Sequence, residues 1–208
     1  MPSIYQLKPA FQNMLRPLVS GMYKLGIQAN HVTLAAMLLS VGLSVGLYCY
    51  YSNHAVNYWI LLFPIWMLIR MAFNAIDGML AREFLQQSDL GAFLNELCDV
   101  ISDTALYICL IVISPIQAHL LLLLCFLAVL TEFTGVTATL IHKPRCYAGP
   151  MGKSDRAFWL SAITILLLTF ELYGLATELQ SLIINGLLAI ISILCIWTVI
   201  NRIRLSLA

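Results

Sequence analysis

Carboxylate and amide side chains interrupt one of the most apolar parts of the chain. Asn74 and Asp77 stand three residues apart, and Asn95 and Asp99 stand four residues apart in the polar stretch that follows. At about 3.6 residues per helical turn, each pair occupies one face of a helix. Oxygen ligands without histidine or cysteine suit hard ions such as Mg²⁺ or Mn²⁺, which also bind phosphates. The pattern therefore predicts one or two divalent ions between two antiparallel helices, with a phosphate-bearing ligand.

Small residues accompany these oxygens. Gly78, Ala81 and Gly91 leave room for a bulky group to lie against the helix backbones. The same residues would also allow two helices to pack closely while the Asp and Asn side chains hydrogen-bond across the contact. The spacing alone is compatible with both interpretations.

The composition places these polar groups in a membrane protein. Of 208 residues, 61% are hydrophobic and only 10% are charged, and the mean hydropathy is +0.90. A soluble domain has roughly one-half apolar and one-quarter charged residues. A formal net charge of +1 gives no reason to expect a nucleic-acid partner. The six cysteines include no CxxC pair and are expected to act as small hydrophobes in a reducing compartment.

Apolar runs of about 20 residues, the length that crosses a bilayer as a helix, divide the chain. We expect six, joined by short connections, so that residues 1–208 form a single all-α, polytopic membrane domain. Residues 29–208 are the transmembrane bundle, and residues 1–28 precede it. The predicted spans are His31–Tyr51, Tyr58–Leu80, Ala92–Ser114, Ile116–His142, Ala157–Tyr173 and Leu179–Ile200.

The segment 1–28 mixes apolar and basic residues. It is predicted to be an amphipathic helix in the membrane interface, interrupted at Pro9 and Pro17. A disordered tail is the alternative. A signal peptide is not expected, because the apolar run begins late and no small-residue cleavage site follows it.

The basic residues are unevenly distributed along the chain. Apart from Arg70, every lysine and arginine lies before the first predicted span, near the turn at 80–90, in the loop at 142–156 or in the tail. Basic residues concentrate on the cytoplasmic side of membrane proteins, so both termini and the polar stretch at 74–99 are predicted at the cytoplasmic face. A bacterial inner membrane is the expected location.

Arg70, Asp103 and Glu132 lie deeper in the predicted spans. Charges at such depth usually pair with one another, so we expect an ion pair from Arg70 to Asp103 or Glu132. Glu96 and Asp103 share the broad helix face of Asp99, and they are alternatively additional charges of the ion site.

Residues 77–99 also resemble a family signature. The family of CDP-alcohol phosphotransferases has the pattern D-x2-D-G-x2-A-R-x8-G-x3-D-x3-D. This chain has Asp77-Gly78-x2-Ala81-Arg82-x8-Gly91-x7-Asp99, and the resemblance extends over the six spans, including Asn30-x2-Thr33 at the start of the first. It implies a homodimeric membrane enzyme that moves a phosphatidyl or related phospho-alcohol group from a CDP-linked donor such as CDP-diacylglycerol to an acceptor hydroxyl, with release of CMP.

The resemblance assigns roles to residues of this chain. Asp77 and Asp99 would bind the divalent ions, and Asp99 would also be the base that takes the proton from the acceptor hydroxyl. The residues expected to line the nucleotide are Gly78, Ala81, Arg82, Gly91, Asn30 and Thr33.

Two positions depart from the signature. Asn74 and Asn95 stand where the family has aspartates. An amide oxygen can bind a hard cation, but it supplies a dipole instead of a unit charge, so the ion affinity should fall. We therefore expect one tightly bound ion, or a second that binds only with the donor.

The loop at 142–156 brings basic residues to the same face, namely Lys143, Arg145, Lys153 and Arg156. Topology and attraction to lipid headgroups account for part of this cluster. The family resemblance suggests that these residues bind an anionic acceptor, such as a phosphorylated polyol.

Two other functions are compatible with the sequence. A family member that keeps the CDP-lipid pocket could bind the lipid without transfer, although the retained Asp99 favours an enzyme. A small transporter is the other candidate. Against it, the acidic residues lie near one face, and the two halves show no inverted repeat.

Overall fold

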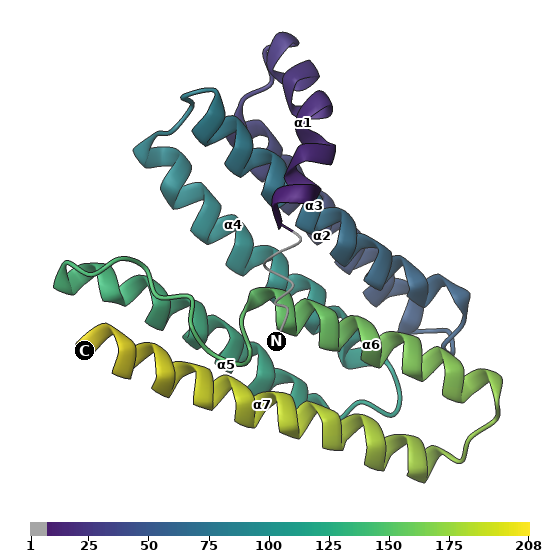
Figure 1. The fold of residues 1–208 in the computed structure, drawn as a ribbon. Coiled ribbons are helices and arrows are strands. Elements are labelled where there is room, and N and C mark those ends of the chain that lie inside the picture. Colours follow the sequence, from purple (N-terminus) through teal and green to yellow (C-terminus); the bar gives the residue numbers. More distant parts are fainter. Residues whose placement is uncertain (1–7) are drawn as a thin grey trace.

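The structure, a computed structural model, describes residues 8–208 as a bundle of helices (Figure 1). No strand occurs in this range, so the predicted all-α fold is confirmed. The α-helices are α1 (Lys8–Lys24), α2 (Ala29–Tyr51), α3 (Leu62–Glu83), α4 (Asp89–Ile108), α5 (Ala118–Thr137), α6 (Lys153–Leu172) and α7 (Thr177–Leu207). Three short 3-10 helices adjoin them, η2 (Tyr58–Leu61), η3 (Cys109–Val112) and η4 (Ala138–Ile141).

The helices form two groups that α6 connects. In the first group α2 packs against both α3 and α4, and α1 lies on α3; in the second, α5 and α7 run side by side (Figure 1). Helix α6 packs against α3 and α7, and α4 packs against α5. The two groups separate toward the end where α4 begins and α5 ends, and α6 begins between them (Figure 1).

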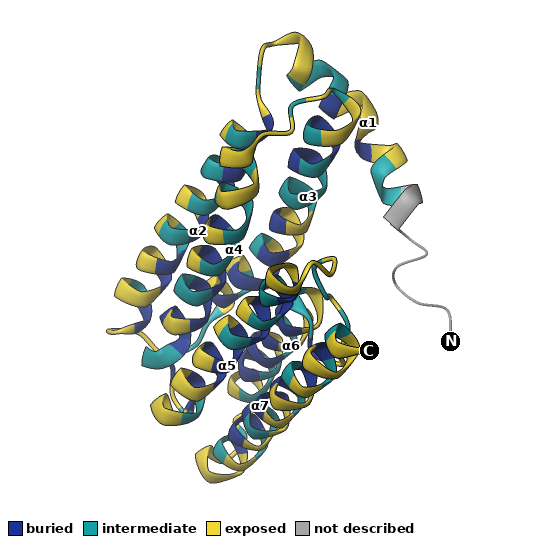
Figure 2. Ribbon diagram, turned by 90° about the vertical axis from the view of Figure 1, so that its left-hand side faces the viewer, coloured by how far each residue is buried: buried dark blue, intermediate teal, exposed yellow. Residues whose placement is uncertain are grey.

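Four stretches are long and apolar enough to cross a membrane, namely Ala29–Tyr51, Tyr58–Glu83, Ala118–Ile141 and Thr177–Leu207. Helices α4 and α6 are each 20 residues long, but their charged residues keep them outside this group. Large apolar side chains such as Leu38, Leu68, Phe126 and Ile193 are exposed on the outer faces (Figure 2). So much exposed apolar surface is characteristic of helices that contact lipid.

Helix α1 is continuous, so the predicted interruption at Pro9 and Pro17 is wrong. Pro9 lies in the first turn, where a backbone N–H has no partner within the helix. Pro17 lies inside the helix and removes one backbone hydrogen bond, and the packing of α1 on α3 offsets this loss. Residues 1–7 of the predicted segment lie outside the described range.

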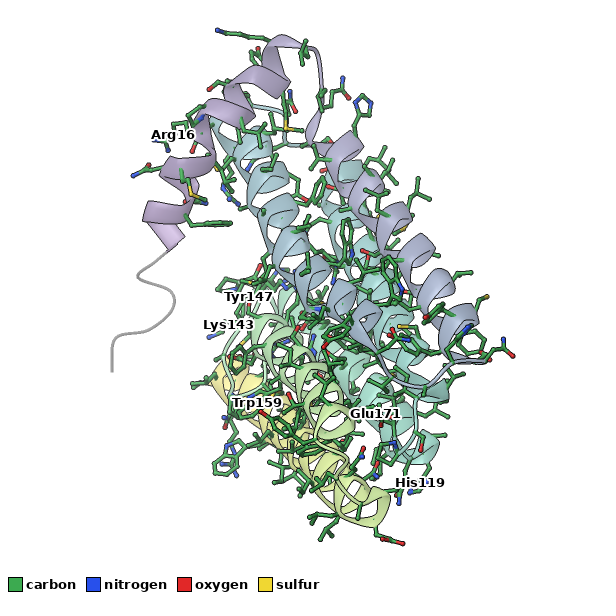
Figure 3. The ribbon with its side chains drawn as sticks, turned by 90° about the vertical axis from the view of Figure 1, so that its right-hand side faces the viewer. Arg16, His119, Lys143, Tyr147, Trp159 and Glu171 are labelled. Carbon is green, nitrogen blue, oxygen red and sulfur yellow. The ribbon has the colours of Figure 1, made fainter. Side chains whose placement is uncertain are left out.

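One face of α1 is buried against the end of α3. Leu15 and Val19 belong to one hydrophobic cluster with Ile76 of α3. Beside this cluster Arg16 donates a hydrogen bond to Glu83 at 3.0 Å, and Arg16 lies at the outer side of α1 (Figure 3). One face of the helix is therefore held on the bundle, while its exposed side carries the apolar Met14 and Leu18 as well as Arg16.

The loop at 142–152 is fixed on α5 and α7. The backbone N–H of Cys146 donates to Gly135 O at 3.1 Å, and that of Met151 donates to Thr198 Oγ1 at 2.9 Å. Gly149 has a φ of +136°, and a Cβ there would lie 2.5 Å from Thr198 Cγ2. Only glycine fits both conditions, so this close approach defines the course of the loop.

Candidate functional site

Asp77 lies in the last third of α3 and is 5% exposed. Its Oδ2 accepts a hydrogen bond at 2.9 Å from Thr33 Oγ1, which also donates to Ala29 O at 3.1 Å. The start of α2 and the end of α3 are thereby joined through a carboxylate. The other oxygen, Oδ1, has no side-chain partner among the described residues.

Asp99 faces the same region from α4, with 23% of its side chain exposed. Its Oδ1 accepts from Arg70 Nη2 at 3.2 Å and forms an ion pair with the amine of Lys153, the first residue of α6. This amine is also close enough to attract Asp77 electrostatically. Asp99 Oδ2 has no partner within the part of the chain that the structure describes.

Asn74 and Asn95 are partly exposed and lie about one turn from Asp77 and Asp99 on their helices. We call these four residues the acidic site. They offer two carboxylates and two amide oxygens, a donor set that fits a hard divalent ion such as Mg²⁺ or Mn²⁺. Within the described residues no three His, Cys, Asp or Glu side chains gather as a metal cluster, because two of the four donors are amides.

The residues predicted to line a nucleotide come together at one end of α2, α3 and α4. A Cβ on Gly91 would lie 2.9 Å from Asn30 Oδ1, so the starts of α4 and α2 touch there. A Cβ on Gly78 would lie 2.7 Å from Arg82 Nη2, so Gly78 lets Arg82 fold back over α3. Ala81 is partly exposed beside them.

The predicted ion pair of Arg70 with Asp103 is confirmed. Arg70 is 4% exposed and Asp103 is 6% exposed, and Arg70 Nη1 donates to Asp103 Oδ1. Arg156 Nη2 lies 3.7 Å from Asp103 Oδ2 on the other side. Asp103 is therefore enclosed by two guanidinium groups, which explains its burial without a metal ion.

Glu132 of α5 pairs with three arginines, and the sequence did not predict this group. It accepts from Arg145 and Arg156 at 2.8 Å each, and Arg202 Nη1 lies 3.7 Å from its Oε2. Arg202 is 1% exposed and donates to the carbonyl oxygens of Thr131 and, at 3.3 Å, Ala148. We call Glu132, Arg145, Arg156 and Arg202 the Glu132 cluster. Arg202 follows an apolar run like any cytoplasmic flanking charge, so no sequence signal distinguished it.

The four residues predicted to bind an acceptor lie in different surroundings from one another. Lys153 reaches the acidic site, and Arg145 joins Glu96 to the Glu132 cluster. Arg156 is fully buried and donates to Thr131 Oγ1 at 2.8 Å as well as to Glu132. Lys143 is exposed, on the side of the bundle opposite to His119 and Glu171 (Figure 3).

Arg145 lies in the loop and is half-buried. Burial lowers the pKa of its guanidinium from the usual value, and the neighbouring Tyr147 acts in the opposite direction. The guanidinium carbon lies 4.7 Å from the centroid of the Tyr147 ring, a distance at which a cation is attracted to the ring face. In this part of the chain the Nε atoms of Arg145 and Arg156 are buried without a hydrogen-bond partner.

A family model described as CDP-alcohol phosphatidyltransferase matches residues 27–200 of this chain. The chain therefore belongs to the CDP-alcohol phosphatidyltransferase family of membrane transferases of phospholipid synthesis, as its signature predicts.

Among its relatives is the inner membrane protein YnbA of Escherichia coli strain K12, which is 48% identical over 205 residues, covering 97% of this chain and 95% of YnbA. An uncharacterized protein of Aquifex aeolicus strain VF5 is 34% identical over 135 residues, 64% of each chain. These matches extend the similarity well beyond the signature.

Solved structures share the fold. The phosphatidylinositol phosphate synthase of Mycobacterium tuberculosis, in complex with manganese and citrate, superposes with a TM-score of 0.72 at 16% identity, covering 92% of this chain and 88% of the synthase. The same synthase with CDP-DAG bound also gives 0.72 at 16% identity, covering 91% and 92%.

Proposed function

We propose that this protein transfers a phosphatidyl or related phospho-alcohol group from a CDP-linked lipid, CDP-diacylglycerol, to the hydroxyl of a polar acceptor, with release of CMP. The observation that carries the proposal is the acidic site. Asp77 and Asp99 lie within the family match and come from two helices, and each retains an oxygen without a side-chain partner in the described residues. The synthase of the same fold, solved with CDP-DAG and with manganese, supports the donor and the ion.

The residues of the acidic site have complementary tasks. Asp77, Asp99, Asn74 and Asn95 would hold Mg²⁺ or Mn²⁺, which would offset the charge of the diphosphate and of the departing CMP. Asp99 accepts the proton of the acceptor hydroxyl while the new phosphorus–oxygen bond forms and the bond to CMP breaks. The nucleotide lies along Asn30, Thr33, Gly78, Ala81, Arg82 and Gly91.

Basic residues at the start of α6 and in the preceding loop receive the acceptor. The side chain of Lys153 is 25% exposed. Its amine can therefore leave the ion pair with Asp99 and bind an incoming anion instead. Lys143 and Arg145 extend this positive region, whereas Arg156 holds the loop from inside. A phosphorylated polyol fits these charges better than a neutral amino alcohol does.

We propose a membrane arrangement that suits this reaction. The chain crosses the inner membrane six times as a single domain of residues 1–208, with α1 in the interface and both termini in the cytoplasm, and it acts as a homodimer surrounded by lipid. Helices α4 and α6 are the two spans of low apolarity because each carries several charged residues, Asp99 and Lys153 among them. A reaction at the boundary between lipid and cytosol lets a lipid donor meet a water-soluble acceptor.

The test is CMP release from CDP-diacylglycerol by the purified protein, with Mg²⁺ or Mn²⁺ and a panel of acceptors. Release that depends on the ion and is lost in Asp99→Asn supports the proposal and identifies the acceptor. Binding of the donor without release from any acceptor would instead establish a lipid-binding protein. Uptake of a solute into vesicles without CMP would establish a transporter.

A further inference from the structure

Arg70 is a charged group of the acidic site that the signature does not include. It lies in α3 one turn before Asn74, and its guanidinium reaches across to α4. Nη2 donates to both Oδ1 and the backbone oxygen of Asp99, each at 3.2 Å. One guanidinium nitrogen thus links the Asp99 side chain to the backbone oxygen of the same residue, which restricts the side-chain conformation.

Arg70 is anchored independently of any ligand. Its Nη1 donates to Asp103, whose other oxygen faces Arg156. Only 4% of the surface of Arg70 is exposed, so its charge is held in the interior beside Asp103. Lys153, the other cation on Asp99, differs because its longer flexible stem is a quarter exposed.

We propose that the Arg70 guanidinium, anchored by Asp103, is a permanent positive charge of the acidic site that fixes one oxygen of Asp99 and limits the site to a single divalent ion. This inference rests on the proposed function, which supplies the reason for an ion. It assigns Arg70 as a positioning residue.

The charges of the site support this limit. The family signature has four carboxylates, whereas this chain has two and holds a guanidinium against one of them. A second divalent ion would bring two more positive charges next to Arg70, and the nearby carboxylates of Asp103 and Glu96 are already paired with arginines. Asp99 has Oδ1 committed to Arg70, so a single oxygen of that carboxylate is free to bind.

The experiment counts bound Mn²⁺ in the purified full chain by the electron paramagnetic resonance signal of free Mn²⁺, with and without CDP. The variant is Arg70→Gln combined with Asp103→Asn, which frees Asp99 Oδ1 from the guanidinium and leaves neither member of the buried ion pair as an uncompensated charge. We expect one Mn²⁺ per chain in the unaltered protein. In the paired variant we expect a second ion, or at least fivefold tighter binding of the first.

The matched control is Arg16→Gln with Glu83→Gln, which neutralises an exposed ion pair between α1 and α3. It should leave the ion count and affinity unchanged. Two ions of similar affinity in the unaltered protein, or a folded paired variant with unchanged count and affinity, would overturn the inference.

A second variant and a measurement of CMP release separate the remaining outcomes of the experiment. If the paired variant aggregates on size exclusion, Arg70→Lys retains the charge without the fork and should still bind one ion, and two would overturn the proposal. Absence of bound Mn²⁺ with and without CDP overturns the proposed function together with this inference. Two ions in a protein that releases CMP overturn the inference alone.

Discussion

The acidic site and the Glu132 cluster both bring charged side chains together inside the bundle, but these charges are satisfied to different degrees. In the cluster, Arg156 and Arg202 are at most 1% exposed, and both lie against Glu132 and backbone or hydroxyl oxygens. In the acidic site, Asp77 Oδ1 and Asp99 Oδ2 have no side-chain partner in the described residues. Paired buried charges are explained by folding, whereas carboxylates that keep an oxygen without a side-chain partner are available to a ligand.

The comparison predicts that mutations in the two regions separate activity from stability. In the proposed function Asp99 serves chemistry, and its neighbours would keep their other contacts after its neutralisation. Glu132 serves the fold, because removing its charge leaves three guanidinium groups without their shared partner.

The largest effect is expected for Asp99→Asn. Loss of a base typically lowers the rate about 10²-fold to 10⁴-fold, and the amide also loses the ion's charge partner. CMP release measures the loss, and Asp89→Asn on the exposed start of α4 is the matched control. Activity of Asp99→Asn within a factor of three of the unaltered protein would place the base elsewhere.

Glu132→Gln should mainly destabilise the protein. Breaking a buried ion pair by removing one partner costs about 3–5 kcal/mol. Thermal unfolding in detergent or nanodiscs measures the effect, with the exposed Glu178→Gln as control. Equal melting temperatures for the two variants would show that the cluster contributes no net stability.

A smaller loss is expected for Gly149→Ala. The φ of +136° strains any other residue, and the new Cβ would meet Thr198, so the free energy of unfolding should fall by about 1–3 kcal/mol. Gly186→Ala is the control, because nothing lies within 4 Å of its Cβ position in α7. A Gly149→Ala protein as stable as this control would mean that the loop can take another course.

The smallest effect is expected for Arg16→Gln. Arg16 and Glu83 are 52% and 37% exposed in their side chains, and such surface pairs contribute less than about 1 kcal/mol. The same unfolding measurement applies. A loss as large as that of Glu132→Gln would contradict the link between burial and energetic contribution on which the comparison rests.

Local patterns made much of this architecture predictable from sequence. Apolar length predicts the helices, and helical spacing places Asn74 with Asp77 and Asn95 with Asp99. Depth alone predicts that Arg70 pairs with Asp103 or Glu132, because a charge inside an apolar helix needs a nearby partner, and the fold selects Asp103.

The Glu132 cluster was not predictable in the same way. Arg202 and Glu132 are 70 residues apart in sequence, and only the packing of α7 on α5 brings them together. Likewise Pro17 signals a helix break locally, while the contacts that keep α1 continuous come from α3. Whether the acidic site holds an ion and a nucleotide stays a prediction, since the fold arranges the donors without identifying what they bind.

The order of the buried ion pairs along the chain has a consequence for biogenesis. The two partners of each pair lie on consecutive helices. Arg70 of α3 pairs with Asp103 of α4, and Glu132 of α5 pairs with Arg156 of α6. A lone charge at mid-bilayer costs roughly 2.5–3.5 kcal/mol on insertion scales. In the six-span arrangement proposed above, the α3–α4 and α5–α6 hairpins would each enter the lipid with one buried ion pair already formed.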